Sequence, residues 1–334
     1  MGPSSPFVDL LLAVPATGYH AVQKTREQAY RRGLLRATAS PVPVISVGNL
    51  LMGGSGKTPF VIYLATALLQ RGRKPAVVSR GYRGSHRGPH LVVGDGSSAR
   101  PLAQPAVAGD EPFLMARRLP RVPVVIGRRR IHPAREAVRL FHCDVIILDD
   151  GFQHLPLQRD ADIVLLTGQE DRMFPRGRLR EPFSALGRAH LVVLAGDSST
   201  VPSPAVRYLP DRPVFRCSER ALSLETVDRD ARPEEYADRE VVLASGIANP
   251  ERFRQTAQRL GWRVADHLVF PDHHRFTAPS LGQGDRPRGS LEDRNDAGSG
   301  RGVLERAGRS HQADGSILKG PAERALPMEL PSEH

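Results

Sequence analysis

The residues best suited to chemistry lie in one glycine-rich stretch, Gly53-Gly54-Ser55-Gly56-Lys57-Thr58. Glycines leave backbone N–H groups free to surround phosphate oxygens, a lysine adds positive charge, and a threonine hydroxyl can bind Mg²⁺. The stretch therefore predicts that these six residues bind a nucleoside triphosphate. One departure from the strict pattern is Leu51, which stands where a glycine is usual.

A second chemical pattern spans residues 144–154, where an apolar run ends in two acids, Asp149 and Asp150. In phosphate-loop enzymes a carboxylate at the end of a buried strand helps to hold Mg²⁺. Gln153 and His154 lie just beyond, where side chains can orient phosphates or pass a proton. The two patterns together favour an enzyme that uses a nucleoside triphosphate with Mg²⁺.

Asp110 and Glu111 open a predicted helix over residues 110–119. Negative charge is electrostatically favoured at a helix N-terminus, so capping alone explains both residues. A chemical role for Asp110 is of interest because phosphoryl transfer to a hydroxyl needs a carboxylate nearby.

Three further segments allow both a chemical and a structural role. The arginines at 128–130 and the proline-bounded loop at 174–182 can hold an anion, yet each can equally be a solvated surface loop. Asp272-His273-His274 invites a metal hypothesis, but no third ligand accompanies it at the usual spacing.

Apolar runs and helix signals supply the elements that must position these side chains. Strands are expected over residues 42–47, 74–79, 122–126, 144–149, 162–166 and 190–195, and helices over 59–70, 110–119 and from near 133. Alternation of these elements predicts an α/β fold with a mostly parallel, phosphate-loop type sheet flanked by helices. A smaller α/β unit follows, with a strand at 241–244 and a helix introduced by Asn249 and Pro250.

Composition sets the domain boundaries that we expect. The Ser- and Pro-rich residues 197–213 suggest a linker, and from 282 onwards apolar residues lose all periodicity. We therefore expect an N-terminal helical segment at 1–36, a phosphate-loop domain at 37–208, a smaller α/β domain at 209–281, and a disordered or divergent tail at 282–334 that can leave the smaller domain incomplete.

The chain of 334 residues carries a net charge of +11, which indicates an acidic partner such as nucleic acid, anionic lipid or a phosphorylated substrate. A GC-rich genome explains part of this basicity equally well.

The two cysteines form no metal-like pair and fit a reducing compartment. No signal peptide is evident, and the apolar residues 7–14 fall short of the ~20 needed to span a bilayer. Residues 7–36, apolar and then basic, suit either a helix at an anionic membrane surface or one packed on the core.

Six motifs in order resemble one family. They are residues 48–59, Ser79-Arg80-Gly81-Tyr82, Gly109-Asp110-Glu111-Pro112, residues 148–154, Leu179-Arg180-Glu181-Pro182 and Asp272-His273. Over residues 7–281 the chain closely resembles the tetraacyldisaccharide 4′-kinases, the lipid A 4′-kinases of Gram-negative bacteria. That family does not keep a glycine at the position of Leu51.

The resemblance implies transfer of the ATP γ-phosphoryl group to the 4′-hydroxyl of tetraacyldisaccharide 1-phosphate at the cytoplasmic face of the inner membrane. It implies Asp110 as catalytic base, assisted by His273, and Lys57 on the phosphates. Mg²⁺ would be held by Thr58 with Asp149 or Asp150. Glu111, Gln153, His154, Arg180 and Glu181 would complete the nucleotide site, and the N-terminal helix would dock on the anionic membrane.

The tail is the main departure, because nothing between residues 282 and 334 matches the α/β structure with which the family continues. Two rival functions follow from the residues themselves. One is an ATP-dependent enzyme acting on a soluble small molecule, and the other is a non-catalytic ATP-binding adaptor for membrane or nucleic acid. The resemblance to the 4′-kinase family implies neither a nucleic-acid partner nor an obligate protein partner.

Overall fold

The computed structural model describes residues 6–98, 100–168, 170, 172–196, 201–210, 212–218, 224–225, 230–247, 249–272, 274 and 276. These residues fall into two compact units, which we treat separately. Unit 1 runs as far as residue 218, and unit 2 begins after it.

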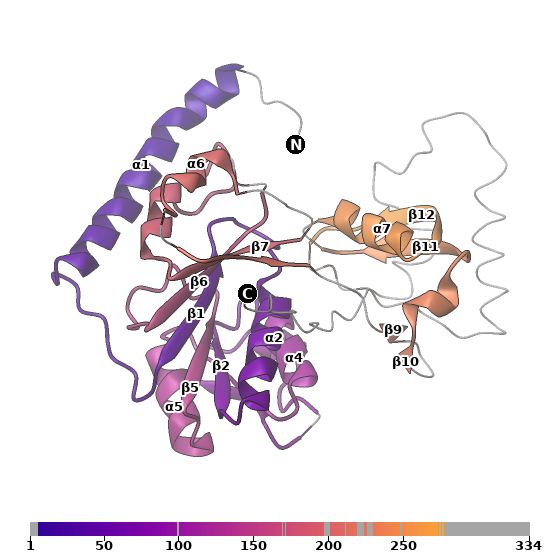
Figure 1. Cartoon of the computed structure of the whole chain (residues 1–334), viewed down its shortest axis with the longest axis horizontal. Helices are drawn as coiled ribbons and strands as arrows, with labels where there is room; N and C mark the ends of the chain where they lie inside the picture. The colour runs from indigo at the N-terminus through magenta and orange to yellow at the C-terminus, as the bar shows by residue number, and fades with distance from the viewer. Residues whose placement is uncertain are drawn as a thin grey trace, which may run out of the picture. The chain divides into compact units, whose positions relative to one another are not determined.

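Regular structure alternates between strands and helices through most of unit 1 (Figure 1). The strands are β1 (Val44–Asn49), β2 (Pro75–Ser79), β3 (Leu91–Asp95), β4 (Pro123–Ile126), β5 (Val145–Asp149), β6 (Ala161–Leu166), β7 (Leu191–Ala195) and β8 (Val214–Cys217). The helices are α1 (Pro6–Arg31), α2 (Lys57–Gln70), α3 (Pro105–Ala108), α4 (Asp110–Arg118), α5 (Ile131–Phe141), α6 (Ser203–Val206) and the 3₁₀ helix η1 (Phe183–Arg188).

The eight strands form one sheet in the order β3-β4-β2-β5-β1-β6-β7-β8. All neighbours pair in parallel except β3, which runs antiparallel to β4 at one edge. The central strand β5 is buried at every position, as expected for a parallel strand covered on both faces. The six predicted strands correspond to β1, β2, β4, β5, β6 and β7, and the predicted α/β class is confirmed.

Helices cover both faces of this sheet (Figure 1). On one face, α2 and α4 bury Phe60, Val61 and Met115 against β-strand side chains such as Val77. On the other face, α5 covers β2, β4 and β5, while η1 and α6 cover β6 and β7. This layering leaves the carboxyl ends of the parallel strands at one edge, where ligands of such sheets bind.

Two strands of the sheet were not expected from the sequence. β3 and β8 are only partly buried and carry polar residues, so they lack the continuous apolar run that marks a central strand. β8 pairs with β7, and the sheet therefore extends beyond the boundary that we placed at residue 208.

Unit 2 contains a parallel pair of strands, β11 (Glu240–Ser245) and β12 (Arg263–Val269), joined by α7 (Pro250–Arg259). The N-cap of α7 is Asn249, whose side chain accepts a hydrogen bond from Arg252 N at 3.1 Å, as the sequence predicts. A short antiparallel pair, β9 (Leu224–Glu225) and β10 (Asp230–Ala231), and the 3₁₀ helix η2 (Pro233–Tyr236) precede β11.

α1 is the N-terminal helix that the sequence places at residues 7–36. The helix packs on the rest of unit 1, where Ala16 is buried, while Val22 and Lys24 remain exposed. Within the part of the chain that the structure describes, none of the helices has the length and apolar character needed to cross a membrane. Both interpretations of this segment, surface docking and core packing, thus remain compatible with its structure.

Candidate active site

The loop Gly53–Thr58 connects the carboxyl end of β1 to α2. Because α2 begins at Lys57, its free N–H groups lie in the loop, which is a favourable arrangement for an anion. Gly56 has a φ of 75°, a left-handed conformation that disfavours a side chain. Behind the loop, the buried Asn49 Nδ2 donates to Ser55 Oγ across 2.7 Å. The predicted phosphate-binding residues therefore lie together in a loop with the shape of an anion site.

Leu51, the departure from the strict motif, is part of the hydrophobic core. It is buried in the same cluster as Leu179, with which its backbone also forms an isolated antiparallel bridge. The next residue, Met52, donates its N–H to Arg178 O at 2.8 Å. The start of the loop is thus fixed against residues 178–180, a role that needs an apolar side chain rather than a glycine.

Two adjacent carboxylates end β5 beside the loop. Asp149 is buried and accepts a hydrogen bond from Ser79 Oγ at 2.8 Å. Asp150 has a φ of 47°, with Oδ1 3.5 Å from Lys57 Nζ and Oδ2 2.9 Å from Arg180 Nη1. The ion pairs of Asp150 therefore link the phosphate loop to the segment that carries Arg180.

The pKa values of these two neighbouring acids are shifted in opposite directions. Burial, with the negative charges of Glu111 and Asp150, raises the pKa of Asp149 to about 7. Burial also acts to raise the pKa of Asp150, but Lys57 and Arg180 outweigh it and hold that pKa below its ordinary value. Asp149 is thus a carboxylate short of positive charge, whereas Asp150 is already neutralised by two cations.

The donor set at this position fits Mg²⁺. Asp149 Oδ1 is buried and has no hydrogen-bond donor among the described residues, and the buried Asp150 Oδ1 has among them only the 3.5 Å ion pair with Lys57. Oxygen ligands of this kind are those that Mg²⁺ prefers, usually with nucleotide phosphates and water completing the shell. No cluster of three His, Cys, Asp or Glu side chains occurs within the described ranges, so phosphate oxygens would have to supply the remaining ligands.

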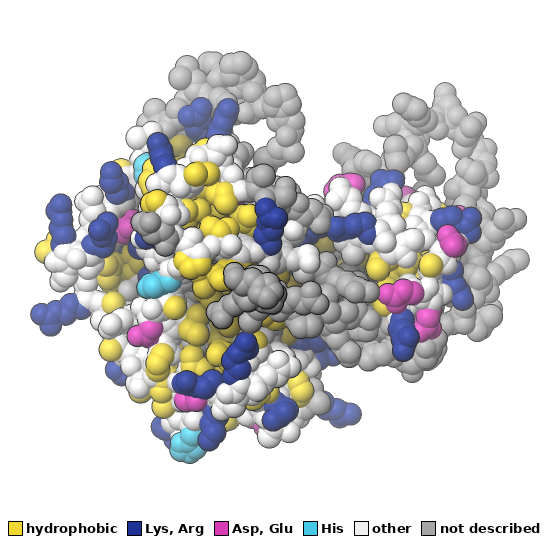
Figure 2. Space-filling view, viewed as in Figure 1, with side chains coloured by type: hydrophobic (Ala, Val, Ile, Leu, Met, Phe, Trp, Pro, Cys, Tyr) yellow, Lys and Arg dark blue, Asp and Glu magenta, His cyan; other side chains and the backbone are white. Residues whose placement is uncertain are grey.

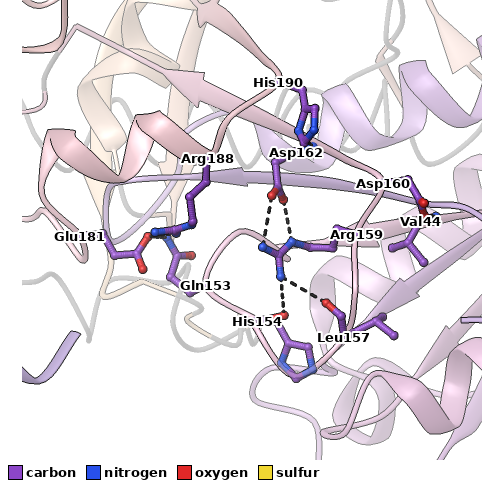
Figure 3. Close-up of polar contacts among 10 residues, drawn as sticks. All are labelled: Val44, Gln153, His154, Leu157, Arg159, Asp160, Asp162, Glu181, Arg188 and His190. Atoms are coloured by element: carbon purple, nitrogen blue, oxygen red, sulfur yellow. Dashed lines mark hydrogen bonds and ion pairs between the residues drawn. The ribbon is translucent and has the colours of Figure 1, made fainter. Parts of the chain in front are cut away.

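Opposite the phosphate loop stands a group of polar side chains that we call the ion-pair wall, namely Gln153, Arg180, Glu181 and Arg188. Gln153 Nε2 donates to Asn49 O at 2.9 Å and lies 3.4 Å from Glu181 Oε2. Arg188 Nη2 donates to the same Glu181 oxygen at 2.7 Å (Figure 3). The wall therefore joins residues from β1, the loop after β5 and η1.

Arg159 fastens the loop that carries Gln153 and His154 (Figure 3). Its Nε and Nη2 pair with the two oxygens of the buried Asp162 at 2.8 and 3.2 Å. Its Nη1 donates to His154 O at 3.0 Å and Leu157 O at 3.2 Å. Because Asp162 belongs to β6, this bidentate pair holds the loop after β5 to the neighbouring strand.

Positive charge collects near the carboxyl ends of β4 and β5. Of the three arginines at 128–130, only Arg130 is buried, whereas Arg128 and Arg129 are exposed. Burial and the nearby Arg80 lower the pKa of Arg130 to about 10, which still leaves it charged at neutral pH. Burial and this positive charge also lower the pKa of His154 to about 3, so His154 is neutral.

Asp110 and Glu111 form the first turn of α4, as predicted. The helix is preceded by Gly109, with a φ of 93°, where a side chain would collide with Tyr82 O. Both carboxylates are exposed, and the negative charge of Glu111 contributes to the raised pKa of Asp149. The first turn of α4 therefore faces the carboxyl end of β5.

Comparison with known proteins shows the family to which the chain belongs. Residues 8–291 match the family model of tetraacyldisaccharide-1-P 4′-kinase. The chain belongs to the tetraacyldisaccharide-1-P 4′-kinase family. Tetraacyldisaccharide 4′-kinase from Anaeromyxobacter dehalogenans is 41% identical over 84% of this chain and 76% of its own length, and that from Syntrophus aciditrophicus is 41% identical over 83% and 78%. A crystal structure of LpxK from Aquifex aeolicus in complex with ATP superposes with a TM-score of 0.68 at 35% identity, over 80% of this chain and 83% of the other.

The structure brings most of the predicted site residues of this family member together. Lys57, Asp150 and Arg180 are joined by ion pairs, and Gln153 lies beside Glu181. His273, the predicted partner of Asp110, lies outside the described residues. Asp272, next to it, belongs to unit 2 and is exposed.

Sequence reasoning missed several residues that support the site. Glu27 and Arg188 contact each other from distant parts of the chain, and Arg159 acts through a buried pair with Asp162 three residues later; no local pattern marks any of them. Arg130 differs from its two arginine neighbours only in burial, which the sequence did not reveal. Asn49 stood in the first motif, but its hydrogen bond to Ser55 appears only in the fold.

Basic side chains outnumber acidic ones over the face of the molecule drawn in Figure 2. They are scattered among apolar and neutral side chains on that face rather than gathered in one continuous stripe. The net charge of +11 thus reflects, on this face, a dispersed excess of arginine and lysine.

Proposed function

We propose that this chain is an ATP-dependent kinase that phosphorylates the 4′-hydroxyl of tetraacyldisaccharide 1-phosphate. The observation that carries this proposal is the ion-paired arrangement of Lys57, Asp150 and Arg180 at the phosphate loop of a chain that belongs to this family. The relatives are kinases by name, and the Aquifex aeolicus structure was solved with ATP.

In this function the loop Gly53–Thr58 binds the ATP phosphates through its backbone N–H groups and Lys57. Arg180 and Lys57 stabilise negative charge on the transferred group, since both already face the acids at the end of β5. Glu111, Gln153, His154 and Glu181 complete the nucleotide site. Thr58, Asp149 and Asp150 would hold Mg²⁺, which neutralises phosphate charge when it is bound.

Asp110 is the proposed catalytic base. The 4′-hydroxyl oxygen forms a bond to the γ-phosphorus, the bond from that phosphorus to the bridging oxygen breaks, and ADP leaves with the electron pair. Asp110 takes the hydroxyl proton, because an alcohol is a poor nucleophile while it keeps that proton. An exposed position at the first turn of α4 suits a carboxylate that must meet an incoming substrate. His273 is proposed to assist Asp110.

The acceptor carries acyl chains, so we propose that the enzyme works at a membrane surface on its cytoplasmic side. α1 is the proposed docking element, because it exposes Val22, Lys24 and Arg31 along the same stretch that contacts the rest of unit 1. A basic and apolar helix surface binds anionic bilayers by charge and by partial insertion. Neither a nucleic acid nor an obligate protein partner is part of this proposal.

The test is transfer of labelled phosphate from ATP to disaccharide 1-phosphate in detergent, with Asp110→Asn as the variant. We expect Asp110→Asn to reduce transfer by about 10²-fold or more while it still binds ATP, because general base catalysis contributes on that order. Glu136→Gln, which removes an acid from an exposed pair on α5, is the control. Product formation without the lipid acceptor, or normal transfer by Asp110→Asn, would contradict the proposal.

A further inference from the structure

Helix α1 contacts unit 1 at side chains that belong to the nucleotide site or adjoin it. Glu27 Oε2 lies 3.1 Å from Arg188 Nη1, and Arg26 Nη1 donates to Gln153 O at 3.3 Å. About two turns toward the N-terminus, the ring of Tyr19 packs edge-on against Phe174, with centroids 5.7 Å apart. A helix that served only as an anchor would need no contact with these particular residues.

Arg188 is the residue through which α1 reaches the ion-pair wall. Its guanidinium lies between two carboxylates, with Nη1 toward Glu27 and Nη2 toward Glu181, and its carbon stands 4.4 Å from the centroid of the Phe152 ring. Burial acts to lower the pKa of Arg188, but Glu181 and Glu27 outweigh it and raise that pKa. The guanidinium is thus held from three sides.

The chain of contacts continues from Arg188 to the phosphate loop. The Glu181 side chain is only 4% exposed, so its negative charge depends on Arg188 for compensation. Gln153 lies between Glu181 and the carbonyl of Asn49, whose side chain in turn holds Ser55 of the loop. A shift of Arg188 would therefore change the positions of Glu181, Gln153 and the end of β1.

We propose that Glu27 of α1 is a positioning residue for nucleotide binding, acting through Arg188 on Glu181 and Gln153. This inference rests on the proposed ATP site and adds to it a dependence on the N-terminal helix. Two partners fix a guanidinium plane better than one, because a single carboxylate leaves the arginine free to change rotamer. Loss of Glu27 then loosens Glu181 and weakens ATP binding without touching the nucleotide.

The experiment is a double-mutant cycle on the affinity for a non-hydrolysable ATP analogue with Mg²⁺, measured by calorimetry on the full chain in detergent without lipid. We expect Glu27→Gln to weaken binding about fivefold, the lower end of typical coupling between sites. Arg188→Gln should weaken it more, and Glu27→Gln should then have no further effect in the Arg188→Gln background. Glu136→Gln, the matched loss of one carboxylate from an exposed pair with Arg139, should bind as the parent does.

Two results would overturn the inference: parental affinity in Glu27→Gln, or effects of the two substitutions that simply multiply. If Arg188→Gln folds poorly, Arg188→Lys takes its place, because it keeps the charge and removes the second arm of the fork. A parent protein that binds no nucleotide would overturn the proposed function itself. Normal binding by the parent with an unaffected Glu27→Gln would overturn the role of α1 alone.

Discussion

The two sides of the proposed nucleotide site are built by different kinds of contact. The glycine-rich part of the phosphate loop is shaped by neighbours in sequence: β1 leads into it, α2 leads out of it, and Asn49 holds Ser55 six residues later. The ion-pair wall is positioned by residues far apart in the chain, with Gln153, Glu181 and Arg188 meeting Asn49 and Glu27. One side is therefore fixed by local backbone geometry, and the other by long-range charge.

This difference indicates how each side should respond to substitution. A residue of the loop acts directly on phosphate, so its loss should affect the reaction and spare the fold. A residue that supports the wall is buried and charged, so its loss should affect stability first, because an unpaired buried charge is costly.

The largest expected effect is on the loop side, in Lys57→Met. Turnover should fall about 10³-fold, because a preorganised cation that stabilises developing charge contributes on that order. Initial rates of phosphate transfer at saturating ATP would measure it. The thermal midpoint should fall only slightly, because Asp150 keeps its ion pair with Arg180, and the control Lys74→Met, an exposed lysine before β2, should retain its rate. If Lys57→Met turned over ATP at a rate within threefold of the parent's, the proposed role of Lys57 in phosphoryl transfer would be wrong.

A smaller effect, on stability, is expected on the wall side in Arg159→Met. Breaking its buried pair with Asp162 should lower the free energy of unfolding by about 3 kcal/mol, the usual cost of leaving one buried charge alone. Urea unfolding would measure the change. The control Arg73→Met breaks an exposed pair with Asp144 and should cost less than about 1 kcal/mol. Equal losses in the two variants would show that burial does not distinguish these pairs.

The smallest effect concerns pH and His154, which follows Gln153 of the wall. Its pKa in the folded protein is about 3, well below the ordinary value of 6.5, because of burial and nearby arginines. The unfolded chain therefore takes up the proton first, so the stability due to neutral His154 is complete above pH 6.5 and is lost as the pH falls below it. His154→Gln should lose stability less steeply than the parent between pH 7.5 and 5 in urea titrations.

The control for that titration is His132→Gln on α5. It should follow the pH dependence of the parent. Parallel stability curves for the parent and His154→Gln would mean that His154 does not stay neutral in the fold.

The same contrast explains how far the sequence could predict the structure. The apolar runs ending at Ser79, Ile126 and Asp149 predicted central strands, because a parallel strand covered on both faces must be apolar throughout. β3, β8 and β12 (Leu91–Asp95, Val214–Cys217 and Arg263–Val269) lie half exposed and mix polar with apolar residues, which gives no clear period.

The candidate site follows the same division. The loop residues Gly53–Thr58 were found from spacing alone, because their function depends on local backbone shape. Gln153 was predicted from its place just after Asp149 and Asp150, Arg180 and Glu181 were predicted through resemblance to a family, and Arg188 was not predicted at all. Its importance comes from lying between Glu27 and Glu181, and that position exists only after α1 and η1 have packed.

The proposed role of Glu27 would also make α1 a thermodynamic link between two ligands. Free energies of coupled binding are reciprocal, so whatever holds α1 in its packed position must raise ATP affinity by the same factor by which ATP strengthens that hold. With Glu27 on the helix and Arg188 on the wall, a lipid surface that grips α1 would act as a positive effector of the kinase. The enzyme would then load its nucleotide preferentially where its acceptor is found.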